Sequence, residues 1–133
     1  MAHKNEKTLR ASDAAMTQGN PQPMFDHFTD DAVIHIGGKN KLAGDYKGKD
    51  QLMETFGRFM QALGENPSFD THEVLANDTH GVVLQTARAT RGGKSIAIDG
   101  IAIFHFDGAG KVTEAWFSDA DPYTADPWYD AGL

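Results

Sequence analysis

The sequence contains no cysteine, which excludes disulfide bonds, thiol nucleophiles and cysteine-bound metals. It also has no apolar run near the roughly 20 residues that a membrane-spanning helix needs. The stretch "MAHKNEKTLRASDAAM" lacks the apolar segment of a signal peptide. Basic residues are scarce, since 12 Lys and Arg stand against 19 Asp and Glu and give a net charge of −7. We therefore expect a cytoplasmic protein whose partners include neither nucleic acid nor membrane.

Motifs for a serine nucleophile and for common cofactors are missing as well. The sequence has no GxSxG, no P-loop and no GxGxxG between a strand and a helix. Its 6 histidines show neither an HxH nor an HxxxH spacing, which argues against a metal site. We expect no metal and no cofactor, which leaves acid/base chemistry or simple binding.

Hydrophobic residues make up 40% of the 133 residues, which indicates one folded domain over residues 1–133. Helices are expected over residues 5–18, in "NPQPMFDHF" and over residues 49–63. In the last of these, Leu52, Met53, Phe56, Phe59, Met60 and Leu63 form a wide apolar stripe that Gly64 ends. "DDAVIHIGG" predicts a short strand, "NKLAGDYKG" predicts turns, and the tail "DPYTADPWYDAGL" predicts a terminal turn or lid.

Four further strands are expected over residues 69–76, 82–90, 95–106 and 111–118. Their short connections "NDTHG", "RGG" and "DGAG" favour an antiparallel meander. Helices followed by strands indicate an α+β fold, with a curved antiparallel sheet wrapped on three helices.

The strand over residues 95–106 is apolar on both faces. One face carries Ile98, Ala102 and Phe104, and the other carries Ile101 and Ile103. Helices can cover only one face of the sheet in so short a chain, so the other face needs a partner. We expect a homodimer through the outer face, with Ile101, Ile103 and Trp116 in the interface.

The order of "FTDDAV", "AGDYKGKDQL" and "FDGAGKVTEAW" resembles the nuclear transport factor 2-like superfamily, in its polyketide-cyclase-like (SnoaL-like) and ketosteroid-isomerase-like branches. This resemblance covers nearly the whole chain and implies a cone-shaped α+β barrel with an apolar pocket, usually dimeric. Members include isomerases, cyclases, dehydratases, epoxide hydrolases and carriers, so the fold alone does not choose an activity.

The resemblance also implies where functional groups would stand. The base of the steroid isomerases falls on Ile36, their strand acid on Ala102 and their tyrosine on Ser12, so that mechanism is absent. A shift of one residue in the first strand would place His35 at the base position instead. The cyclase branch has an acid just after a tryptophan at the end of the last strand. Here Asp119 follows Trp116 after two intervening residues.

The hairpin geometry also bears on Asp119. If Phe106 faces Lys111, then Ile98 lies opposite Asp119, and directly opposed residues share a face. Asp119 would then point inward among Ile98, Ala102, Phe104 and Phe117, where burial raises the pKa of a carboxyl group. A strand-end carboxylate that accepts backbone N–H bonds at the rim is the alternative. For Asp121, which precedes Pro122, we expect turn initiation.

The role of the other candidate residues depends on whether their side chains point into the pocket. A neutral imidazole at His35 could move protons near neutral pH, although this histidine could also face outward. The facing of His72 is open, Gln85 could hydrogen-bond a ligand carbonyl, and Tyr46 could reach the pocket mouth or simply pack in its loop. The predicted catalytic residues are Asp119 and His35. The predicted ligand-binding residues are Gln85, His72, Tyr46, Phe56, Phe59, Ala102, Phe104 and Phe117.

Together these features predict a small-molecule-binding protein. The first hypothesis is a cofactor-independent acid/base enzyme of the cyclase, isomerase or dehydratase type that acts on an apolar, carbonyl-bearing substrate. The alternative is a non-catalytic binding or carrier module that uses the same pocket.

Overall fold

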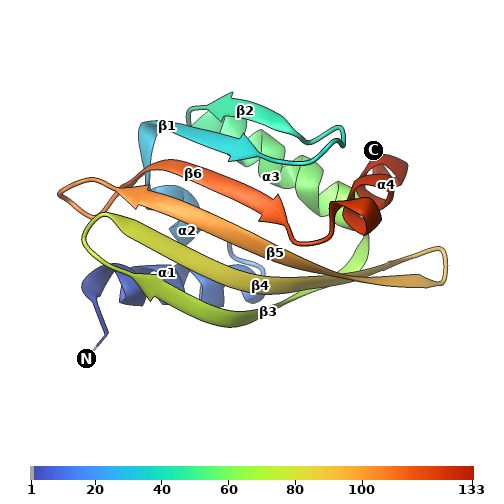
Figure 1. The fold of residues 1–133 in the computed structure, drawn as a ribbon, viewed down its shortest axis with the longest axis horizontal. Helices are drawn as coiled ribbons and strands as arrows, with labels where there is room; N and C mark the ends of the chain where they lie inside the picture. Colours follow the sequence, from blue (N-terminus) through green and yellow to red (C-terminus); the bar gives the residue numbers. More distant parts are fainter. Residues whose placement is uncertain (1) are drawn as a thin grey trace.

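The fold is a six-stranded curved sheet with helices on its concave side (Figure 1), seen in a computed structural model that describes residues 2–133. The helices are α1 (Lys4–Thr17), α2 (Gln22–Asp26), α3 (Lys49–Leu63) and α4 (Pro122–Gly132). The strands are β1 (Phe28–Ile36), β2 (Gly44–Lys47), β3 (Glu65–Ala76), β4 (His80–Arg91), β5 (Lys94–Phe106) and β6 (Val112–Asp119). Among residues 2–133, no helix is both long and apolar enough to cross a membrane.

The strand order is β2-β1-β6-β5-β4-β3. Strands β3 to β6 form the expected antiparallel meander. The predicted α+β fold with a curved sheet packed on helices is confirmed, and the sheet differs from the prediction in two details. Strand β1 pairs with β6 in parallel, which makes the sheet mixed. The sheet also remains open, with β2 and β3 as its edges.

Two segments take up more regular structure than their composition suggested. The turn-rich "NKLAGDYKG" contains β2, which pairs antiparallel with β1 from Lys47 opposite Val33 to Gly44 opposite Ile36. The tail folds into α4, which begins where the Asp121 side chain accepts a hydrogen bond from the backbone N–H of Thr124. A carboxylate at this position stabilises a helix start by accepting an otherwise unpaired N–H.

Helix α3 shows why the core lies where it does. Its inward side carries Leu52, Ala62 and Leu63, which are 5%, 0% and 0% exposed. The stripe is narrower than the sequence pattern suggested, since Met53 is 47% exposed and points away from the core. Gly64 ends the helix in a backbone conformation with φ +121°, which L-residues with side chains rarely adopt.

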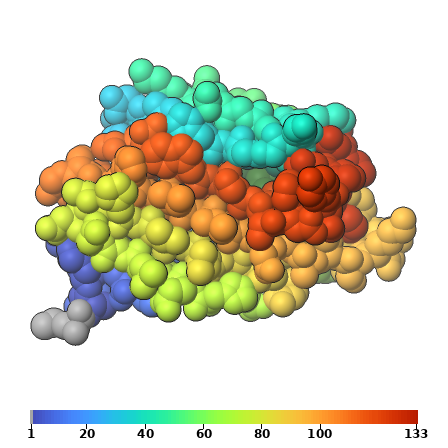
Figure 2. All heavy atoms as spheres, viewed as in Figure 1, coloured from blue at the N-terminus to red at the C-terminus, as the bar shows by residue number. Residues whose placement is uncertain are grey.

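The two faces of the sheet differ as the sequence of β5 predicted. Ile98, Phe104 and Phe106 are buried beneath the helices, whereas Ile101 and Ile103 are each 38% exposed. Figure 1 shows α1, α2 and α3 behind the sheet, and Figure 2 shows the opposite face uncovered by them. The helices therefore enclose the concave face and leave the other face open.

Candidate functional site

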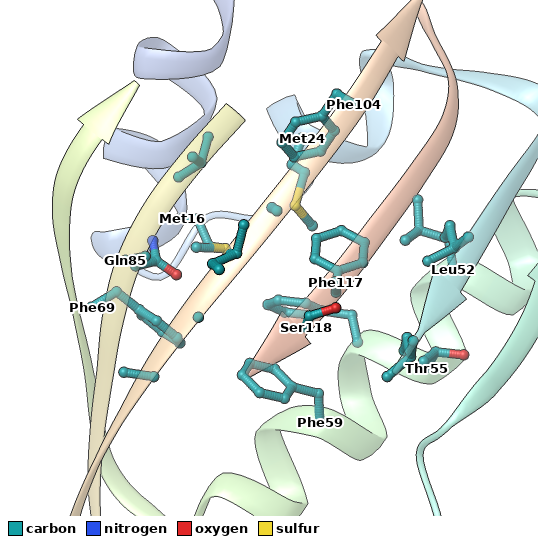
Figure 3. Close-up of a pocket in the computed structure, with 18 of the residues that line it drawn as sticks. Met16, Met24, Leu52, Thr55, Phe59, Phe69, Gln85, Phe104, Phe117 and Ser118 are labelled. Atoms are coloured by element: carbon teal, nitrogen blue, oxygen red, sulfur yellow. The ribbon is translucent and has the colours of Figure 1, made fainter. Parts of the chain in front are cut away.

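A cavity of about 220 Å³ lies between the helices and the concave face of the sheet. Its walls are mainly apolar (Figure 3), with Phe56 and Phe59 from α3, and Phe104 and Phe117 from β5 and β6. Apolar walls with a few polar groups are typical of sites for small organic ligands.

Asp119, the last residue of β6, lines this cavity. The residue opposite it on β5 is Gly100, not Ile98 as the simple hairpin register suggested. The difference arises because Phe106 pairs with Val112, and a bulge follows between Phe106 and His105. The total slip is two residues, and because side chains alternate with a period of two, the face of Asp119 is unchanged.

The environment of Asp119 favours its protonated form. Burial, reinforced by the nearby Asp126 carboxylate, raises its pKa from 3.8 to about 6. The hydroxyl of Tyr129 donates to Asp119 Oδ1 at 3.5 Å and opposes this rise. Near neutral pH the group is therefore mostly a carboxylate, yet it takes up and releases protons within a physiological range.

Tyr129 comes from α4 and is 4% exposed. Burial, followed by the Asp119 charge, raises its pKa above the ordinary tyrosine value of 10.0, so that the phenol stays neutral and keeps its proton. Tyr129 was not among the predicted site residues. The signal was present, because Ala125 and Tyr129 are four residues apart and would share one face of a helix.

Helix α4 is fixed against the rest of the fold next to Tyr129. The indole N–H of Trp128 donates to the carbonyl of Leu63 at 2.7 Å. The guanidinium of Arg91 donates to the Trp128 carbonyl at 2.9 Å and lies 4.4 Å from the centre of the Trp128 ring. These contacts hold the segment that supplies Tyr129 at the cavity wall.

Gln85 lines the cavity from β4, as expected. Its side-chain nitrogen donates to Asp13 Oδ1 at 2.7 Å, and Asp13 lines the cavity from α1. Asp13 was not among the predicted site residues.

His35 does not lie in this cavity, so the expectation that it assists Asp119 is corrected. Ile34 and Ile36 line the cavity, and the alternation along β1 turns His35 to the opposite face. There its ring nitrogens lie 2.6 Å from Asp45 Oδ1 and 2.5 Å from Glu114 Oε2. The hydrogen bond to Asp45 raises the pKa of His35 most, and the hydrogen bond to Glu114 raises it further.

Two other predicted ligand-binding residues also lie outside the cavity lining. His72 is exposed, and its Nε2 is hydrogen-bonded to the Thr86 hydroxyl. Tyr46 packs against the core, and its hydroxyl donates to the Leu42 carbonyl at 2.6 Å, which is the packed alternative. The remaining predicted positions Asp119, Gln85, Phe56, Phe59, Ala102, Phe104 and Phe117 all line the cavity.

The three positions carried over from the steroid isomerases are in the cavity too. Ser12, Ile36 and Ala102 contribute to its walls. None of them bears an ionisable side chain, and the Ser12 hydroxyl donates to the Thr8 carbonyl within its own helix. The three positions therefore lie in the cavity wall, but they carry none of the acid and base groups of the steroid isomerases.

The model of the SnoaL-like domain matches residues 9–115. The chain belongs to the SnoaL-like family. A comparison with curated proteins found no match. Within the solved structures, this SnoaL-like protein is similar to Bal32a, from a soil-derived mobile gene cassette, at 27% identity and a TM-score of 0.82. That alignment covers 94% of this chain and 95% of Bal32a.

Two more distant structures share the fold of this SnoaL-like protein. TerC, co-crystallised with polyporic acid, is 17% identical with a TM-score of 0.79, over 94% of this chain and 97% of TerC. SalBIII is described as an epoxide hydrolase/cyclase-like enzyme with a role in pyran ring formation in the polyether salinomycin. It is 15% identical with a TM-score of 0.69, over 88% of this chain and 91% of its own. At these identities the similarity establishes the nuclear transport factor 2-like fold and nothing finer.

Proposed function

We propose that this SnoaL-like protein is a cofactor-independent acid/base enzyme of the cyclase, isomerase or dehydratase type, with an apolar, carbonyl-bearing substrate. The observation that carries the proposal is Asp119, a carboxyl group with a pKa of about 6 at the wall of an otherwise mainly apolar cavity. Such a pKa suits a group that must accept and return a proton near neutral pH.

The chemistry requires only this chain and its substrate. The Asp119 carboxylate removes a proton from the carbon next to the substrate carbonyl, and the electron pair of that C–H bond moves into an enolate. The enolate then has three possible fates. It attacks a second carbonyl carbon of the substrate, whose oxygen takes the proton from Asp119; where the substrate has a C=C bond conjugated with the enolate, it takes the proton back at the far carbon of that bond; or it expels a β-hydroxyl group, which leaves as water with the proton from Asp119. These three outcomes correspond to cyclisation, isomerisation and dehydration, and none of them needs an oxidant or reductant.

The neighbours support a small-molecule role. SalBIII is a cyclase-like enzyme and TerC was crystallised with polyporic acid, so the same fold occurs in proteins that act on or bind small organic molecules. In this chain, Tyr129 donates to Asp119 and helps to hold the carboxylate in one orientation. His35 has no part in the proposal, since it lies on the opposite face of the sheet.

The test follows proton exchange, which does not require knowledge of the natural substrate. We expect the wild-type protein to accelerate the exchange of the α-protons of 2-tetralone in D₂O, measured by NMR, and Asp119→Asn to lose this activity. The matched control is Asp121→Asn, which changes a nearby exposed carboxylate that caps α4. Equal exchange in wild type and Asp119→Asn would remove Asp119 from the role of base.

A second candidate is a non-catalytic carrier. It is favoured by the absence of ionisable groups at Ser12, Ile36 and Ala102, which line the cavity. Native mass spectrometry of the purified protein, followed by extraction of any bound compound, separates the two candidates. A compound that is held tightly and recovered unchanged after prolonged incubation supports the carrier. A compound that is converted supports the enzyme.

We further propose that two copies pair through the outer sheet face. Leu84 and Ile101 are cross-strand partners, as are Ile103 and Trp116, and together they form an apolar surface that no helix of residues 2–133 covers. Leu84, Ile101 and Ile103 are each 37–38% exposed in the single chain. Sedimentation should show a dimer that Ile103→Lys dissociates. A monodisperse wild-type monomer at micromolar concentration would exclude this interface.

A further inference from the structure

A second cluster of polar side chains at the cavity, from α1, β3 and β4, is centred on Gln85, two strands away from Asp119. Gln85 Nε2 donates to Asp13 Oδ1 at 2.7 Å and to the hydroxyl oxygen of Thr71 at 3.3 Å. The Thr71 hydroxyl in turn donates to Asp13 Oδ2. Each of these side chains is partly buried, so their hydrogen bonds are less exposed to competition from water than surface bonds are.

This arrangement fixes which end of the Gln85 amide faces the cavity. A carboxylate has only acceptors, so Asp13 requires the amide nitrogen and not the amide oxygen of Gln85 beside it. The Thr71 hydroxyl donates its only proton to Asp13. Its oxygen can therefore only accept a hydrogen bond from the Gln85 amide nitrogen. Both N–H donors of Gln85 are therefore used, and Figure 3 shows its oxygen on the cavity side.

No residue between 2 and 133 donates a hydrogen bond to the Gln85 amide oxygen. The earlier expectation, in which Gln85 donates to a ligand carbonyl, must therefore be reversed. The group that Gln85 offers is an acceptor, and its natural complement is a hydroxyl on the ligand. A ligand carbonyl placed there would put its oxygen against the Gln85 amide oxygen. Neither oxygen can donate a hydrogen bond, so this contact would weaken ligand binding.

Gln85 and Asp119, two of the polar residues that line the cavity, lie on one row across the sheet. Gln85 pairs with Gly100 on the neighbouring strand, and Gly100 pairs with Asp119 on the next. Two strand spacings separate the backbones of Gln85 and Asp119, or about 10 Å. Because Gly100 has no side chain, the sheet between the two polar residues is bare backbone, against which a flat ring can lie.

The glycine is not required by the backbone. A Cβ built at Gly100 would have its nearest contacts at 3.7 Å from the Ser118 carbonyl oxygen and 3.8 Å from that of Gln85, both ordinary distances. Alanine therefore fits the fold at this position and differs mainly by a methyl group that projects into the ligand space.

We propose that Gln85 is a specificity-determining residue whose amide oxygen accepts a hydrogen bond from a hydroxyl of the substrate, across a flat gap from Asp119. The substrate class is then a planar cyclic carbonyl compound with a hydroxyl at the end remote from the reacting carbon. Asp13 and Thr71 are positioning residues that hold the amide in this orientation. The inference rests on the proposed function for the role of Asp119, but the orientation of Gln85 stands independently of it.

The test uses two probes of different length, 4-hydroxyacetophenone and 6-hydroxy-2-acetylnaphthalene, each compared with its own methyl ether. Dissociation constants are measured by NMR titration of the wild-type protein and of Gln85→Met, which keeps the side-chain length but removes the acceptor. We expect wild type to prefer at least one phenol over its ether by about three- to tenfold, the value of one neutral hydrogen bond. Gln85→Met should abolish that preference.

Two further variants separate positioning from simple structural damage. Asp13→Asn frees the Gln85 amide to turn over and should reduce the preference for the phenol without preventing binding of the ether. Thr71→Ser keeps the hydroxyl and should retain the wild-type preference. Gly100→Ala should leave the melting temperature nearly unchanged while weakening all four probes.

The outcomes distinguish this inference from the proposed function. Phenols and ethers bound equally by wild type, with α-proton exchange still dependent on Asp119, would overturn the acceptor role of Gln85 alone. A preserved phenol preference with no dependence of exchange on Asp119 would overturn the enzyme proposal alone. Failure of all four probes to bind would overturn the inference of a planar cyclic substrate, while the role of Asp119 would still be decided by the exchange assay.

Discussion

The carboxyl group of Asp119 should reduce the stability of the folded protein at neutral pH, and its replacement by asparagine should restore that stability. Asparagine has nearly the same shape and can still accept a hydrogen bond from Tyr129, but it carries no charge. The variant therefore mimics the protonated acid at every pH. If the reasoning about burial is right, Asp119→Asn is more stable than wild type at high pH and nearly equal to it at low pH.

The size of the effect follows from the pKa. Folding raises the pKa of Asp119 from 3.8 to about 6, which corresponds to about 3 kcal/mol at about 1.4 kcal/mol per unit. Part of the side chain remains open to solvent, which screens the charge, so we expect about 1–2 kcal/mol. A raised folded pKa favours the folded state below the unfolded value, and this advantage is lost as the pH rises through about 6.

The assay is urea unfolding of both proteins at about pH 4.5 and about pH 8. The difference in unfolding free energy should grow by about 1 kcal/mol or more between these conditions. Asp121→Asn provides the control, since its exposed carboxylate caps α4 and asparagine caps equally well. A difference that is the same at both pH values, or one that favours wild type more strongly at high pH, would refute the burial argument.

Three further outcomes follow from the structure. Gly64→Ala should lower the unfolding free energy by about 2 kcal/mol or more in thermal melts, because φ is +121° and a Cβ would lie 2.6 Å from the Thr90 carbonyl oxygen. The control Gly57→Ala, in open space on α3, should leave the unfolding free energy unchanged or raise it. Asp121→Ala should lower the unfolding free energy by about 1 kcal/mol through loss of the α4 cap, and an unchanged value in urea would contradict it. The raised pKa of His35 stabilises the fold below its unfolded value of 6.5, so the advantage of wild type over His35→Gln should shrink as the pH rises from about 6 to about 9, and a constant advantage would contradict this sign.

Local sequence patterns predicted the elements whose stability is itself local. The apolar stripe of α3 and the short turns of the meander are encoded within a few residues, and both are present. The parallel pairing of β1 with β6 has no such signal, because Ile34 and Ala115 are brought together across most of the chain. Likewise, a segment such as "VIHI" shows that successive side chains alternate between the two faces of the sheet, but not which face each one takes. The face of His35 therefore depends on contacts that the sequence does not display.

At the site, composition indicated the groups but not their orientation. Asp119 was found because its neighbours in the hairpin are apolar and the slip of two residues preserved its face. Gln85 was found as a cavity residue, yet its direction depends on Asp13, which is distant in sequence and was identified only when α1 was seen against β4. A side-chain amide has a donor and an acceptor at opposite ends, so its chemical role follows from its partners more than from its identity.

The parallel join between β1 and β6 has a kinetic consequence. Strands β3 to β6 can pair one after another through short turns, but β1 reaches β6 only by closing a loop that contains α3 and four strands. Contacts of such long range are slow to form, because the entropy of the closed loop is lost before the contacts compensate for it. Ile36 and Phe117, which are paired across this join, both line the cavity. We therefore expect the binding cavity to be completed late in folding, and a bound ligand to act chiefly by slowing unfolding.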